Sequence, residues 1–194
     1  MKSLGRAVLV ATALLLLPAF AFAQSDDQQF LSKAAQDGMA KIQWAYLALQ
    51  NAQNPQVRLF AQQMLNDYGQ AQNDLIYIAN QQGVVLPRDL DPKDRQTFEA
   101  LSQLHGAAFD KAYMKAMLND PQMQPSGLKE EAAKANNPAI ANWATKTLPT
   151  LQSDLKEAQK IAPAVGIHSP PTDKKQPAAG NAQPAGKPAS PDAY

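Results

Sequence analysis

Apolar residues recur every three or four positions from Asp26 to Ile161, and this spacing constrains the fold more than any other feature of the chain. It is the spacing of helices that each bury one face, and no window shows the sustained alternation of a half-buried strand. Short connections between long helices favour antiparallel neighbours. We therefore expect an all-α, up-and-down four-helix bundle over 26–161, with one short extra helix around Phe98.

Three residue pairs predict where helices begin. In each pair an Asn or Asp side chain can cap the helix, and the following proline fits the first helical position. The pairs are Asn54-Pro55, Asp91-Pro92 and Asn137-Pro138.

The helix that begins near Phe109 is predicted to break within 119–127. Pro121 and Pro125 fall inside its expected length, and an interior proline costs about 3 kcal/mol because it removes a backbone hydrogen bond. Ser126 can cap a restart. The break is either a functional opening or a tolerated loop.

The first 23 residues have the pattern of an export signal. Lys2 and Arg6 precede an apolar stretch over 7–20, and Ala21-Phe22-Ala23 gives the small-x-small pattern before a cleavage site. The stretch is shorter than the roughly 20 residues that a spanning helix needs. We expect a signal peptide over 1–23, no transmembrane segment after its cleavage, and export to the periplasm of a Gram-negative cell or secretion from another cell.

The other end of the chain, 164–194, is rich in proline and alanine and poor in large apolar residues. Such a segment buries too little surface to offset the entropy lost on ordering. We predict a disordered tail, which either is simply solvated or serves as a spacer or recognition segment.

Composition removes several function classes. The 18 basic residues balance 17 acidic ones, so the chain lacks the basic character of a nucleic-acid binder. Cysteine is absent, which excludes disulfides, thiolate metal sites and a cysteine nucleophile. Histidine occurs only at positions 105 and 168, and no Glu-x-x-His pair is present. We therefore expect no enzymatic activity, no cofactor and no histidine-rich metal centre.

Three polar residues lie near the apolar stripes: Lys41, Tyr68 and Asp154. If all three point inward, Lys41 and Asp154 can pair and the Tyr68 hydroxyl can join them, because a buried charge without a partner is costly. The alternative is that Lys41 and Asp154 reach solvent from the stripe edge. Trp44 and Trp143 fall beside the stripes, where we expect boundary packing or contact with a partner.

Five motifs occur in an order that resembles an exported bacterial family, the domain of unknown function 4142. The resemblance covers about 30–161 and implies a ferritin-like helical bundle outside the cytoplasm, but no biochemical activity. The motifs are Phe30-Leu31-Ser32-Lys33-Ala34-Ala35, Gly38-Met39-Ala40, Phe60-Ala61-x-x-Met64-x-x-Asp67, Gly106-Ala107-Ala108-Phe109-Asp110-x-x-Tyr113-Met114 and Thr147-Leu148-Pro149-Thr150-Leu151.

The sequence departs from this family at polar positions inside the bundle. The resemblance implies an acidic residue where Lys41 stands, and histidine at the positions of Tyr68, Pro121 and Asp154. Lys41 would place a positive charge where a cation would bind. The departures therefore argue against carrying over a metal site.

Three functions remain open. The first is a non-enzymatic exported bundle that binds an unknown protein or envelope partner. The second is a metal-binding or oxidase-like bundle (iron, manganese or zinc) that uses carboxylates such as Asp67 and Asp154. The third is a carrier of a small apolar ligand, held in a cavity that the break opens beside Met117 and Tyr113.

Overall fold

The computed structural model describes residues 26–168, and this part of the chain is all-helical. The signal peptide predicted over 1–23 and residues 169–194 of the predicted tail lie outside the described residues. The elements are α1 (Asp26–Asn51), α2 (Pro55–Gln81), α3 (Pro92–Ser102), α4 (Gly106–Asn119), the 3₁₀ helix η1 (Pro121–Met123), α5 (Pro125–Lys134), α6 (Pro138–Ile161) and the 3₁₀ helix η2 (Ala162–Val165).

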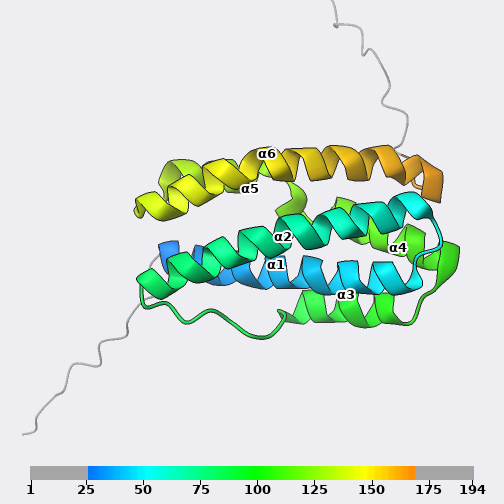
Figure 1. The fold of residues 1–194 in the computed structure, drawn as a ribbon, viewed down its shortest axis with the longest axis horizontal. Helices are drawn as coiled ribbons and strands as arrows, with labels where there is room; N and C mark the ends of the chain where they lie inside the picture. Colours follow the sequence, from blue (N-terminus) through cyan, green and yellow to red (C-terminus); the bar gives the residue numbers. More distant parts are fainter. Residues whose placement is uncertain (1–25, 169–194) are drawn as a thin grey trace, which may run out of the picture.

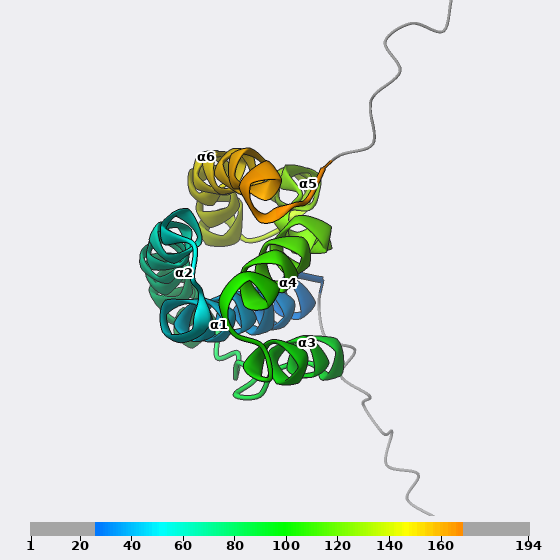
Figure 2. The same cartoon turned by 90° about the vertical axis from the view of Figure 1, so that its right-hand side faces the viewer.

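The long helices form a ring around a shared core (Figures 1 and 2). Helix α1 packs along α2, α2 contacts α6, and α6 packs along α5. Helix α4 contacts both α1 and α6 and so closes the ring. The short helix α3 lies outside the ring against α1 and α4. None of the helices within 26–168 combines the length and apolar character needed to cross a bilayer.

The three predicted helix starts are confirmed. The side chains of Asn54, Asp91 and Asn137 each accept a hydrogen bond from a backbone N–H two or three residues further on, at 2.8–2.9 Å. A proline follows each cap at the first helical position. These contacts supply acceptors for N–H groups that have no partner inside the helix.

The predicted break is present, with one correction. Helix α4 ends at Asn119, η1 begins at Pro121, and α5 begins at Pro125. The residue before α5 is Gln124, so Ser126 lies inside the first turn and does not cap the restart. Proline at the first helical position fixes the start, because its missing N–H is not needed there.

The ordered body extends beyond residue 161, which corrects the tail boundary at 164. Residues 162–165 form η2, which contacts α4. Gly166 then adopts a left-handed conformation with φ of 72°, and Val165 and Ile167 pack against the core. These two apolar side chains gain enough burial to order the start of the predicted tail.

The part of the core that packs against α4 is filled with side chains. Tyr113 stacks on Phe109 at a centroid distance of 5.8 Å, and the neighbouring Met114 and Met117 are fully buried. The predicted cavity beside Met117 and Tyr113 is therefore wrong, because close-packed side chains occupy that place. Trp44 is also buried in this core, so its predicted boundary position is wrong.

Candidate functional site

A cleft of about 250 Å³ lies between α1, α2, α6 and the segment of η1 and α5, which follows the break after α4. Gln122 of η1 and Gly127 and Leu128 of α5 form one wall. The cleft therefore lies next to the break, on its α5 side. The predicted cavity beside Met117 and Tyr113 would have been on its α4 side. Its apolar lining consists of Phe30, Ala34, Ala71, Leu75, Leu128, Trp143 and Leu151.

Aromatic packing gives the apolar wall a fixed shape. The ring of Phe30 meets that of Trp143 edge-to-face at 5.8 Å. The indole N–H of Trp143 donates to the carbonyl oxygen of Ala71 at 3.1 Å, which ties α6 to α2 across the cleft. A buried indole that satisfies its N–H in this way is held in one orientation.

A mid-helix glycine, Gly38, leaves room for the side chain of Gln72 at the cleft. A Cβ at Gly38 would lie 2.6 Å from Oε1 of Gln72, so a larger residue would force the Gln72 side chain to shift. With glycine present, Gln72 donates from Nε2 to the carbonyl oxygen of Ala35 at 3.2 Å. Its Oε1 is buried and has no hydrogen-bond partner among the described residues.

Lys41 is fully buried, so it does not reach solvent from the stripe edge, and its partner is not Asp154, the candidate for an inward-pointing lysine. Its ammonium forms an ion pair with Asp120 and lies 4.7 Å from the ring centroid of Trp44. The predicted pairing of Lys41 with Asp154 is therefore wrong. Sequence reasoning missed Asp120, although Asp120-Pro121 repeats the Asp-Pro signal that starts α3, and Asp120 does accept the N–H of Gln122 at 2.8 Å.

Asp154 and Tyr68 both line the cleft, whereas Lys41 does not. Asp154 is buried and accepts a hydrogen bond from Nε2 of Gln63 at 2.7 Å. Burial, followed by the nearby carboxylate of Asp67, raises the pKa of Asp154 to about 7. The Tyr68 hydroxyl donates to Sδ of Met123 at 3.4 Å, and burial raises the pKa of Tyr68, so the hydroxyl stays protonated.

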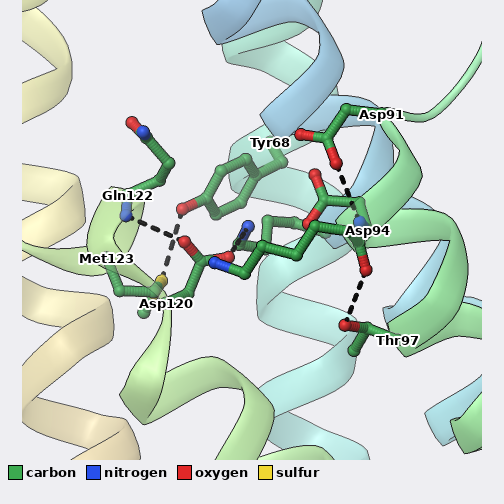
Figure 3. A network of polar contacts seen from close by, with 9 residues as sticks. Tyr68, Asp91, Asp94, Thr97, Asp120, Gln122 and Met123 are labelled. Atoms are coloured by element: carbon green, nitrogen blue, oxygen red, sulfur yellow. Dashed lines mark hydrogen bonds and ion pairs between the residues drawn. The ribbon is translucent and has the colours of Figure 1, made fainter.

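Three carboxylates gather where α1 faces the start of α3, and only Asp37 among them lines the cleft. Sequence reasoning missed this cluster. One oxygen of each of Asp37, Asp91 and Asp94 lies within 4.8 Å of the other two. Figure 3 shows Asp91 and Asp94 in the same polar region as Tyr68 and Asp120. Burial raises the pKa of Asp37 to about 6, although the charge of Lys41 opposes the shift.

The arrangement suits binding. The cleft combines apolar walls with oxygen acceptors from Asp37 and Gln72. His105, one of the two histidines, is exposed at the start of α4 and does not line the cleft. Small-molecule sites have this general character, with a few placed polar groups in an apolar concavity.

Comparison with known proteins identifies a family. The model of a family described as a domain of unknown function (DUF4142) matches residues 17–161. No curated protein matches the chain, and no solved structure matches it.

Proposed function

Because this chain belongs to the DUF4142 family, whose description specifies no activity, we propose a function from the cleft itself. The protein is an exported, non-enzymatic helical bundle that binds a small molecule with an apolar body. The cleft between α1, α2, α5 and α6 is the observation that carries this proposal.

The fold that we propose is a ferritin-like four-helix bundle with an interrupted fourth helix. Helices α1, α2 and α6 supply three columns, and α4, η1 and α5 together supply the fourth. The support is the ring in which these helices are arranged (Figure 2), with the contacts between neighbouring helices. The charged start and apolar stretch of the first 23 residues support export.

The size of the cleft supports a small ligand. Protein interiors are close-packed, with few voids larger than a water molecule. A cleft of about 250 Å³ is far larger than such a void, yet it lies just below the ~300–1,000 Å³ of typical sites for drug-sized ligands. A molecule with up to three rings, or with a short alkyl chain, is of a size that suits this cleft.

The unpartnered polar atoms indicate what else the ligand carries. Oδ2 of Asp37 and Oε1 of Gln72 are buried acceptors without a partner among residues 26–168, and both side chains line the cleft. Asp67 and Asp154 add two further carboxyl groups to the lining, against one exposed lysine, Lys33. A ligand with an N–H donor beside its apolar body would satisfy these acceptors.

N-phenyl-1-naphthylamine tests the proposal because it is apolar, fluoresces strongly in apolar surroundings and carries one N–H. We expect saturable fluorescence enhancement with the full chain. Ala34→Phe, which places a ring in the cleft wall, should weaken binding by about tenfold or more, equivalent to about 1.4 kcal/mol.

Ala133→Phe is the matched control. Ala133 is exposed on α5 and does not line the cleft, so this variant should bind the probe like the wild type. Enhancement that does not saturate, or equal binding by the Ala34→Phe and wild-type proteins, would rule out the cleft as the binding site.

A further inference from the structure

Three carboxylates meet where α1 faces the start of α3. Asp37 comes from the middle of α1, Asp91 caps α3, and Asp94 lies in the first turn of α3. One potential ligand oxygen from each lies within 4.8 Å of the other two. Figure 3 shows the side chains of Asp91 and Asp94 lying close together.

Two of these side chains are buried and carry an oxygen that accepts no hydrogen bond from the described residues. Asp37 is 8% exposed and Asp94 is 4% exposed, and Oδ2 of each is buried without a hydrogen-bond partner among the described residues. Asp91 already uses Oδ1 to accept the N–H of Asp94 at 2.9 Å. Buried polar atoms are satisfied in most proteins, so these two oxygens indicate a missing partner.

The local charges point to a cation as that partner. Lys41 is the buried cation of the region, and its ammonium pairs directly with Asp120. The region therefore holds four carboxyl groups, those of Asp37, Asp91, Asp94 and Asp120, against one buried ammonium. The other nearby cations, Lys33 and Lys93, are exposed. Buried carboxylates that lack a counter-charge are costly, and a bound divalent ion would supply that charge.

We propose that Asp37, Asp91 and Asp94 bind one divalent cation of the oxygen-preferring class, with Ca²⁺ as the best fit. The donor set consists of carboxylate oxygens, which suit Ca²⁺, Mg²⁺ and Mn²⁺. Oxygen ligands lie 2.3–2.6 Å from Ca²⁺, so two of them can be up to about 5 Å apart on opposite sides of one ion, and the separations in this cluster stay within 4.8 Å. Mg²⁺ needs shorter distances and a stricter octahedron, so Ca²⁺ tolerates a wider spread of oxygens than Mg²⁺ does.

This site differs from the metal site considered from the sequence, which used Asp67 and Asp154. The ion would join α3 and the loop over 82–91 to α1. It would thereby stabilise an element that packs outside the main ring (Figure 2). The inference does not rest on the proposed cleft ligand, although Asp37 belongs to both sites.

The test uses the full chain after chelator treatment and dialysis. CaCl₂, MgCl₂ and MnCl₂ are each titrated by isothermal calorimetry, and thermal melts are recorded with and without each salt. We expect one equivalent of Ca²⁺ to bind and the melting temperature to rise. Asp37→Asn and Asp94→Asn should each weaken binding at least tenfold.

Two further variants keep the test decisive. Asp89→Asn removes the same charge two residues from Asp91, but Asp89 is 87% exposed and outside the cluster, so its binding should match the wild type. If Asp94→Asn fails to fold, Asp91→Asn replaces it, because asparagine can still cap α3.

Either of two results would overturn the site. One is a wild-type protein that shows neither binding heat nor a melting shift with any of the three ions, which would mean that protons neutralise the cluster. The other is unchanged binding in the Asp37 and Asp94 variants. Ala34→Phe, which obstructs the cleft, should still bind the ion, so failure of the cleft proposal and failure of this one are separable.

Discussion

Replacing Lys41 with methionine should lower the free energy of unfolding by about 3–5 kcal/mol. Methionine keeps an unbranched chain of similar length, so the apolar stem still packs. The lost ammonium leaves Asp120, which is only 8% exposed, without its counter-charge, and it also removes the contact with the ring of Trp44. For an ordered body of this size, the loss corresponds to a fall in melting temperature of about 10–20 °C.

Chemical denaturation followed by circular dichroism at pH 7 measures the effect. The double variant Lys41→Met with Asp120→Asn should recover most of the loss, because the side chain at position 120 is then neutral and asparagine can still accept the N–H of Gln122. Lys146→Met is the control, since Lys146 is 69% exposed and its ion pair with Asp74 should contribute less than about 1 kcal/mol.

The buried-pair reasoning would be refuted by either of two results. In the first, Lys41→Met costs no more than Lys146→Met. In the second, the losses of the Lys41 and Asp120 single variants simply add in the double variant, because two groups that interact must show a coupling energy.

Two other predictions concern stability. The pKa of Asp154 is about 7 in the folded state and has its ordinary value of 3.8 in the unfolded state. Between these two values the folded state therefore holds an extra proton. As a result, the free energy of unfolding falls as pH rises through that window, by at most about 1.4 kcal/mol per pH unit. Asp154→Asn should make this decline shallower in denaturation curves from pH 5 to 8, most clearly above pH 6, where Asp37 contributes less. Parallel curves for both proteins would contradict the assignment. Asp27 accepts the N–H groups of Asn136 and Asn137 at 3.1 and 2.9 Å, so Asp27→Ala should cost about 1–3 kcal/mol and speed hydrogen exchange at both amides. Unchanged exchange there would show that the carboxylate does not hold the loop between α5 and α6.

The candidate site could be predicted only in part. Lys41, Tyr68 and Asp154 were selected because their spacing places them near the apolar stripes, and Lys41 and Asp154 are indeed buried. The cluster around Asp37 was not found, because its members come from α1 and from the cap of α3, and no local pattern relates them. Asp120 carried a recognisable capping signal, but that signal does not reveal which lysine the carboxylate will meet.

The cleft illustrates the same limit. The break at Pro121 and Pro125 was readable, because proline acts on the backbone within one turn. Whether the break opens a cavity depends on side chains from other helices. Phe109 and Tyr113 fill the space on one side, whereas Gly127 and Leu128 leave a cleft on the other.

The sequence by itself determined the helical class, the three capped helix starts and the position of the break. These features depend on contacts within a few residues, such as that between Asn54 and the N–H of Gln56. Only the tertiary structure decided the partners of the buried charges and the place of the cleft. Lys41 and Asp120 are 79 residues apart, and Gln63 and Asp154 are 91 apart. Such pairs are selected by how whole helices pack, because a buried charge takes the partner that the packed core brings within reach.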